Sequence, residues 1–171
     1  KDLIRQDKSY LYVDVGGGST EFTLFSGGQV ISSSSFRIGT VRLLKEMVSE
    51  DDWAELETWI RKETRGFSKI SIIGSGGNIN KLYKMSGRKS GQPLSYIWLN
   101  AQYQFLGSMT YEERILELGL NPDRADVILP ATRIFLLASK WSGAKQIHVP
   151  QIGLADGIIK DLYYRESAMG V

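Results

Sequence analysis

The sequence contains no cysteine and no long hydrophobic run. Without cysteine, a structural disulfide, a thiolate zinc site and a cysteine nucleophile are all excluded. No apolar run approaches the roughly 20 residues that a membrane-spanning helix needs, and no signal peptide is visible. The formal net charge of only +2 leaves no dense basic stripe of the kind that a general nucleic-acid binder carries. We therefore expect a cytoplasmic protein that binds neither nucleic acid nor a membrane.

The length of 171 residues suits one core with a small helical annex. We expect a single domain over residues 1–171 with a helical insert over residues 95–125. The chain opens with Lys-Asp-Leu rather than with Met, which suggests excision from a longer protein.

Apolar and β-branched segments predict a mixed five-stranded sheet with helices on both faces. The expected strands are residues 10–13, 20–25, 30–36, 69–73 and 146–149. The first three form an antiparallel meander, with a hairpin turn at residues 26–29. The expected helices begin near residues 39, 49 and 78, include two short helices in 99–119, and continue with 121–143 and 153–164. This order of elements resembles the ribonuclease-H-like core of actin, sugar kinases and Hsp70 ATPases, an α/β fold.

The most informative segment is Asp14–Glu21, which reads Asp-Val-Gly-Gly-Gly-Ser-Thr-Glu directly after the first strand. Glycines let backbone N–H groups approach an anion, and hydroxyls add further donors. The carboxylates of Asp14 and Glu21 could hold Mg²⁺ or orient a water molecule. The bland alternative is a hairpin turn with incidental acids. The predicted phosphate-binding residues of this segment are Gly16, Gly17, Gly18, Ser19 and Thr20.

A second glycine loop, Gly74–Gly77, lies between a predicted strand and a predicted helix. Such a loop suits phosphate binding at a helix N-terminus, although close strand–helix packing also needs small residues. In a ribonuclease-H-like fold both glycine loops would approach one cleft. The predicted phosphate-binding residues here are Gly74, Ser75, Gly76 and Gly77.

Other polar residues carry weaker signals. The candidate phosphate partners are the arginines Arg37, Arg42, Arg124 and Arg133, although most single arginines lie on the surface. Arg124 and Asp126 are interpreted as a structural ion pair or as a helix N-terminal feature. The single histidine, His148, lies in a predicted strand and is interpreted as a structural residue rather than a catalyst.

Taken in order, these motifs resemble the exopolyphosphatase and guanosine pentaphosphate phosphohydrolase family. The matching segments are Asp14–Glu21, Arg37–Leu43, Gly74–Gly77, Arg124–Pro130 and Gly153–Gly157. The resemblance implies Mg²⁺-assisted release of terminal phosphate from inorganic polyphosphate or from guanosine pentaphosphate. It implies that Asp14 and Glu21 are the acidic metal and water-positioning residues, and that residues 16–19 bind phosphate.

The resemblance also implies a partner. Family enzymes have a preceding ribonuclease-H-like domain that carries another phosphate loop and a glutamate that acts as general base. This chain then corresponds to the second half of a two-domain core, and we expect it to be inactive when isolated from that N-terminal domain. A homodimer is left open.

Two other functions are compatible with the residues. One is a nucleotide- or alarmone-binding module without turnover. The other is a relative of actin or the sugar kinases that transfers phosphate from ATP.

Overall fold

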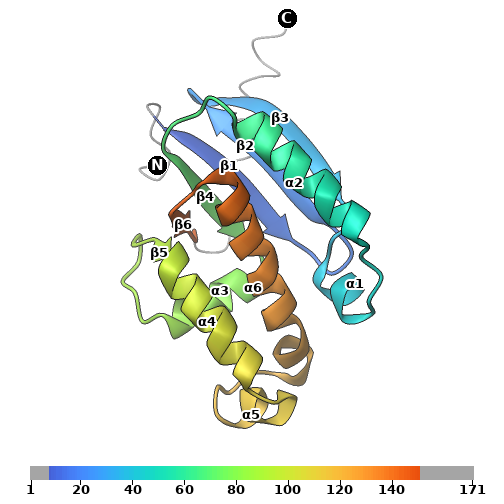
Figure 1. Ribbon diagram of the computed structural model, residues 1–171. Coiled ribbons are helices and arrows are strands. Elements are labelled where there is room, and N and C mark those ends of the chain that lie inside the picture. Colours follow the sequence, from blue (N-terminus) through green and yellow to red (C-terminus); the bar gives the residue numbers. More distant parts are fainter. Residues whose placement is uncertain (1–7, 151–171) are drawn as a thin grey trace, which may run out of the picture.

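The structure is a computed structural model, and it describes residues 8–150 (Figure 1). The helix expected over residues 153–164 lies outside the described residues, as does the segment Gly153–Gly157.

The strands of residues 8–150 form one mixed sheet in the order β3-β2-β1-β4-β6-β5. Their bounds are β1 Ser9–Val15, β2 Thr20–Ser26, β3 Gln29–Phe36, β4 Ile70–Ser75, β5 Leu94–Ser95 and β6 Gln146–His148. Strands β1, β2 and β3 are antiparallel neighbours, β4 and β6 run parallel to β1, and β5 is antiparallel to β6. The predicted meander is therefore confirmed.

The turn between β2 and β3 is a two-residue hairpin turn. Gly27 and Gly28 both adopt left-handed backbone angles, with φ of 61° and 80°. Such angles match the twist of the flanking strands and are natural for glycine. A β-bulge follows at Leu24 and Phe25, where the register between β2 and β3 shifts. This shift determines which β3 residues lie opposite the beginning of β2.

The predicted count of five strands is one too few. The additional strand, β5, has only two residues, Leu94 and Ser95, and it lies at the start of the expected helical insert. Two residues are too short to display the alternation that identifies a strand. Leu94 is fully buried and pairs with Ile147 of β6, so the tertiary contact forms this strand.

The helices have start signals that the sequence displays. Their bounds are α1 Thr40–Leu44, α2 Glu50–Thr64, α3 Gly77–Met85, α4 Tyr96–Ser108, α5 Tyr111–Leu116 and α6 Pro122–Ser142. Capping boxes begin α2, at Ser49 and Asp52, and α5, at Thr110 and Glu113. Gly143 ends α6 in a left-handed conformation, as expected for a C-cap.

The first helix is shorter than predicted. Apolar residues at 41, 44, 47 and 48 suggested one buried helix face, but α1 ends at Leu44. The chain then adopts a positive φ of 54° at Glu46. Val41, Leu44 and Met47 are between 42% and 51% exposed, so their apolar spacing does not reflect burial.

The main core lies between one face of the sheet and the helices. Leu11, Val13 and Val15 of β1 belong to the same buried cluster as the apolar residues of α2, α3, α4 and α6. Figure 1 shows α2 and α6 lying across this face. The alternate residues Tyr10 and Tyr12 belong to a second buried cluster on the opposite face. This second cluster contains no helix residue among residues 8–150, so the described residues do not show the helices predicted for that face.

Candidate functional site

Four polar residues form a row across the sheet where β1 ends. The register pairs Asp14 of β1 with Glu21 of β2, Glu21 with Ser35 of β3, and Asp14 with Ser75 of β4. Side chains directly opposite each other in an antiparallel pair share a face, with Cβ atoms about 4.5–5.5 Å apart. The two acids predicted from the sequence are therefore neighbours. Because Val13 and Val15 face the helices, this row lies on the other face of the sheet.

Glu21 is held by two hydroxyl groups that donate to the same carboxylate oxygen. Ser19 Oγ donates to Glu21 Oε1 at 2.7 Å, and Ser35 Oγ donates to the same atom at 3.1 Å. Glu21 and Ser35 are exposed, and Ser19 is half-buried. These two bonds fix Oε1, and neither of them engages Oε2.

Asp14 has a different environment, because it is only partly exposed. The buried Tyr12 lies two residues earlier on the same strand, and its hydroxyl donates to Asp14 Oδ2 at 3.4 Å. A phenol donor stabilises the ionised carboxylate. The two acids of the pair are thus positioned by separate hydroxyl groups.

Loop one, residues 16–19, turns its carbonyl groups toward α1. The N–H of Thr40 donates to Gly16 O at 3.0 Å, and the N–H of Val41 donates to Gly17 O at 3.0 Å. Gly39 packs so closely on the Gly17 backbone that a Cβ atom there would collide with it. These contacts with the beginning of α1 fix the position of loop one.

The N–H groups of loop one are used differently. Gly16 N donates to Ser19 O at 2.9 Å and closes the turn. The N–H groups of Gly17, Gly18 and Ser19 make no hydrogen bond to other parts of residues 8–150. Since an anion needs several convergent donors, three consecutive unused amides beside two carboxylates suit a phosphate with a bridging cation.

The three glycines of loop one are needed for different reasons, and none has a positive φ. A Cβ atom on Gly16 would lie 3.0 Å from Ser19 O, and one on Gly17 would lie 3.2 Å from Val41 Cγ2. A Cβ atom on Gly18 would have no described atom within 4 Å. The described fold explains the first two glycines, whereas it gives no steric reason for Gly18.

Loop two, residues 74–77, lies next to loop one, as the sequence predicted. Ser75 pairs with Asp14 across β4 and β1. A Cβ atom on Gly76 would lie 3.1 Å from Val15 O and 3.7 Å from Asp14 Oδ1. Gly76 is the N-cap of α3 and has a φ of 109°. The carboxyl ends of β1 and β4 therefore bring both glycine loops to Asp14.

Two of the predicted phosphate-binding residues are buried instead. Thr20 is fully buried, and its hydroxyl donates to Ile38 O at 2.6 Å. Gly74 lies within β4, where a Cβ atom would approach Phe135 Cε1 to 3.0 Å and Ile79 Cγ1 to 3.1 Å. Close packing between strand and helix accounts for Gly74, and the hydrogen bond to Ile38 O occupies the Thr20 hydroxyl. We leave both residues out of the candidate site.

Arg124 reaches loop two. A Cβ atom on Gly77 would lie 2.6 Å from Arg124 Nη1, and that nitrogen donates to Asn78 Oδ1 at 3.4 Å. No ion pair joins Arg124 to Asp126 within the described part of the chain. Of the two sequence interpretations, the helix N-terminal feature holds, because Arg124 lies in the first turn of α6. Its guanidinium brings positive charge to the edge of the site.

Two other arginines have structural contacts. Arg42 Nε donates to Arg37 O at 2.9 Å, and Arg42 Nη2 donates to Met47 O at 3.1 Å. Arg133 lies 4.9 Å from the ring centroid of Trp53 in a cation–π contact. These contacts explain Arg42 and Arg133 without a ligand. Arg37 is exposed.

His148 is separated from the acids by β4. It pairs with Ile73, and its ring makes an edge contact with Tyr10, with centroids 6.3 Å apart. Burial, with a smaller contribution from the charge of Lys8, lowers the pKa of His148. Its Nδ1 makes no hydrogen bond within residues 8–150. Its position beyond β4, away from Asp14 and Glu21, supports the structural interpretation.

Hard oxygen donors dominate the row, which suits Mg²⁺. This ion is usually held by one or two carboxylates together with waters and substrate phosphate. The paired Asp14 and Glu21 offer that number of carboxylates. The described residues contain no group of three or more His, Cys, Asp or Glu side chains that could hold a metal. The site therefore fits an ion shared with a phosphate ligand better than an ion caged by protein alone.

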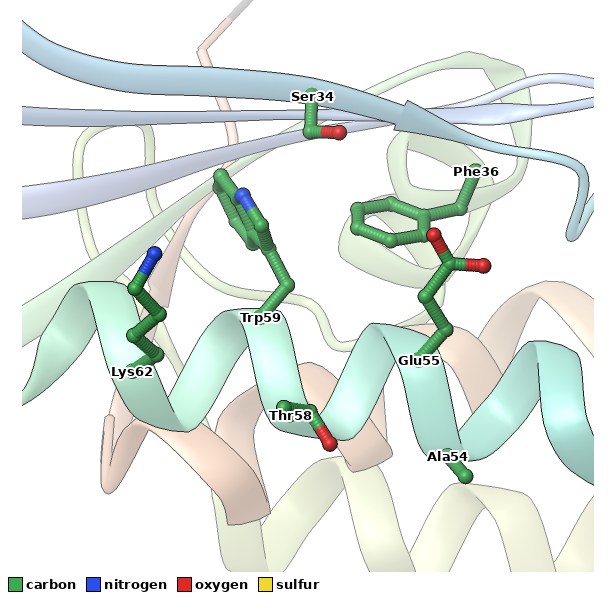
Figure 2. Close-up of a pocket in the computed structure, with 7 residues that line it drawn as sticks. All are labelled: Ser34, Phe36, Ala54, Glu55, Thr58, Trp59 and Lys62. Carbon is green, nitrogen blue, oxygen red and sulfur yellow. The ribbon is translucent and has the colours of Figure 1, made fainter.

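A cavity of about 390 Å³ lies elsewhere, between β3 and α2 (Figure 2). Its lining residues are Ser34, Phe36, Ala54, Glu55, Thr58, Trp59 and Lys62. Figure 2 shows the rings of Phe36 and Trp59 directed into the space between strand and helix. Because Ser34 alternates with Ser35 along β3, the cavity lies on the opposite face from Glu21. It takes no part in the candidate site.

The sequence interpretation missed Tyr12 and Ser35. Tyr12 could have been found by alternation, since residues 12 and 14 share a strand face. Ser35 could not, because counting back from the hairpin turn places residue 34 opposite Glu21. The β-bulge at Leu24 and Phe25 shifts that register by one residue.

No helix within residues 8–150 combines the length and the apolar character that crossing a membrane requires.

Comparisons with known proteins identify a matching family model and similar proteins. A sequence model described as the Ppx/GppA phosphatase family matches residues 2–166. The chain is 27% identical over 146 residues to a bifunctional 3-dehydroquinate synthase/phosphatase of Fusobacterium nucleatum, which covers 72% of this chain and 22% of that protein.

Solved structures agree as well. A crystal structure of the Aquifex aeolicus Ppx/GppA family member has 25% sequence identity and a TM-score of 0.68, covering 94% of this chain and 57% of that chain. An exopolyphosphatase from Cytophaga hutchinsonii has 24% identity and a TM-score of 0.67, covering 85% of this chain and 54% of that chain, and it bears on the fold alone. These neighbours confirm the predicted fold class, the actin-like branch of the ribonuclease-H-like folds. The chain spans about half the length of these solved structures.

Proposed function

Since this chain belongs to the Ppx/GppA phosphatase family, we propose that it is part of a Mg²⁺-dependent hydrolase of phosphoanhydride bonds. The proposed substrate is inorganic polyphosphate or guanosine pentaphosphate, from which a terminal phosphate is released to water. The observation that carries the proposal is the direct pairing of Asp14 with Glu21 beside three loop-one amides that make no hydrogen bond within residues 8–150.

The loop binds the substrate's terminal phosphate. The amides of Gly17, Gly18 and Ser19 donate to its oxygens, and the open space at Gly18 lets the phosphate approach the backbone. Charge spreads over the three equatorial oxygens as the bond to the leaving group breaks. Fixed N–H donors stabilise that charge at little reorganisation cost, because the fold already holds the loop.

The two carboxylates divide the remaining tasks. Asp14, which the Tyr12 hydroxyl orients, and Glu21 would hold Mg²⁺ against the phosphate. The bound ion supplies positive charge that neutralises the phosphate oxygens. Glu21 also orients the attacking water through Oε2, because the Ser35 hydroxyl holds Oε1.

The remaining part of the enzyme is proposed to lie in the same protein. The chain spans 57% of the Aquifex aeolicus structure, so a full-length protein has room for a further domain. We propose that this domain completes the cleft and supplies the general base. The isolated chain is then expected to release no phosphate, and rapid hydrolysis of polyphosphate by residues 1–171 alone would contradict this.

The test is phosphate release by the full-length protein, measured with polyphosphate and with guanosine pentaphosphate, each with and without Mg²⁺. Glu21→Gln should lower kcat at least about 100-fold, because the water loses its orienting carboxylate. Substrate binding should be kept, because the amides of loop one and Asp14 remain. Glu55→Gln is the matched control, since Glu55 lines the cavity on the opposite face of the sheet.

Three outcomes would redirect the proposal. Binding of guanosine pentaphosphate without phosphate release would favour a binding module. A phosphorylated product formed only with ATP would favour a phosphotransferase. Full activity of Glu21→Gln would remove Glu21 from the mechanism.

A further inference from the structure

Ser35 lies on β3, outside the glycine loop, yet it contacts the candidate site. Its Oγ donates to Glu21 Oε1 at 3.1 Å. The register makes this contact direct, because Glu21 and Ser35 are cross-strand partners in the antiparallel pair of β2 and β3. Both residues belong to regular strands, so the backbone pairing itself keeps the two side chains adjacent.

A β-bulge in β3 creates this contact, because Ile31 lies between the partners of Leu24 and Phe25 and pairs with neither. Ser26 pairs with Gln29 beside the turn, and continuing that register without a bulge would place Ser34 opposite Glu21. Ser35 would then point toward the helices, since a slip of one residue exchanges the two faces of a strand. The β-bulge therefore places the Ser35 hydroxyl beside Glu21.

The other hydroxyl on Glu21 has a competing task. Ser19 Oγ donates to Glu21 Oε1 at 2.7 Å, and Ser19 also belongs to the loop proposed to bind phosphate. A serine hydroxyl has one proton, so it cannot donate to Glu21 and to a phosphate oxygen at once. When Ser19 turns to phosphate, Ser35 is left as the donor to Oε1.

We infer that Ser35 is a positioning residue, which holds Oε1 of Glu21 so that Oε2 faces the reacting centre while substrate is bound. This inference rests on the proposed function. Ser35 contacts neither substrate nor metal in this account, so its effect should appear in turnover rather than in substrate affinity.

The experiment compares three variants of the full-length protein that carries this chain. Ser35→Ala removes the donor, and Ser35→Thr keeps a hydroxyl that suits a strand. Ser33→Ala is the matched control, because Ser33 is exposed on the same strand face and donates to Phe22 O at 3.2 Å instead. Kinetics are measured with polyphosphate and Mg²⁺, thermal unfolding checks each fold, and crystal structures record the Glu21 side chain.

Loss of one hydrogen bond to a charged group predicts that Ser35→Ala lowers kcat about tenfold and changes KM less than about twofold. Ser35→Thr should restore most of kcat, and Ser33→Ala should match the unchanged protein. Equal kcat values for Ser35→Ala and Ser33→Ala would overturn the inference, whether both stay high or both fall.

Failure of the proposed function gives a different pattern. If the unchanged full-length protein releases no phosphate from either substrate, the proposed function fails, and the crystal structures decide the positioning role. Displacement of the Glu21 carboxylate in Ser35→Ala, with none in Ser33→Ala, supports positioning. An unmoved carboxylate in both variants overturns it.

Discussion

The two glycine loops differ in why they need glycine. In loop two, every glycine either has close neighbours where a Cβ atom would lie or has a positive φ. In loop one, Gly18 has neither within the described residues. Gly74 packs against Phe135, Gly76 has a φ of 109°, and Gly77 lies under the guanidinium of Arg124. Gly18 does not have a positive φ, and no atom of residues 8–150 lies within 4 Å of where its Cβ atom would be. The glycines of the two loops thus have different explanations. The fold accounts for those of loop two, whereas a bound ligand is the better explanation for Gly18.

The largest expected effect is on stability, at Gly74. Gly74→Val places a branched side chain against Phe135 and Ile79 within a packed core, which should lower the free energy of unfolding by about 3 kcal/mol. Urea denaturation measures the change. Gly77→Ala is the control, because the atoms that it would displace are the flexible end of Arg124. Equal stability of the two variants would show that the packing at Gly74 is looser than described.

A smaller loss is expected at Gly76. Its φ of 109° and ψ of 161° form a backbone conformation that side-chain-bearing residues rarely adopt. Gly76→Ala should therefore lower the free energy of unfolding by about 2 kcal/mol. Thermal or urea unfolding of the full-length protein is the measurement, and an unchanged unfolding midpoint would mean that loop two tolerates a different conformation.

Gly18 should behave in the opposite way. Gly18→Ala should change the free energy of unfolding by less than about 0.5 kcal/mol, because nothing described surrounds the new methyl group. The same methyl group would obstruct phosphate, so kcat/KM for phosphate release should fall about tenfold, equivalent to about 1.4 kcal/mol. Unchanged kcat/KM would remove the distinction between the two loops.

Features set by neighbouring residues were predictable from the sequence. The meander, the turn at Gly27 and Gly28, the helix begun at Thr110 and the C-cap at Gly143 all follow from local pattern and turn chemistry. The pairing of the acids also follows, because a short loop between adjacent strands places Asp14 opposite Glu21.

Features set by distant contacts were not predictable. β5 exists because Leu94 is buried against β6, and α1 ends early although its apolar spacing continues. Thr20 looked like a phosphate donor, yet its hydroxyl bonds Ile38 O, which is 18 residues away in the sequence. The Ser35 contact depends on a bulge that no spacing rule reveals.

The central claim is that loop one binds phosphate with its amides while Asp14 and Glu21 face the same ligand. The most direct test is a crystal structure of the full-length protein with Mg²⁺ and pyrophosphate. The account predicts phosphate oxygens within hydrogen-bond distance, about 2.7–3.2 Å, of the N–H groups of Gly17, Gly18 and Ser19. Pyrophosphate bound elsewhere, with those amides contacting only water, would contradict it.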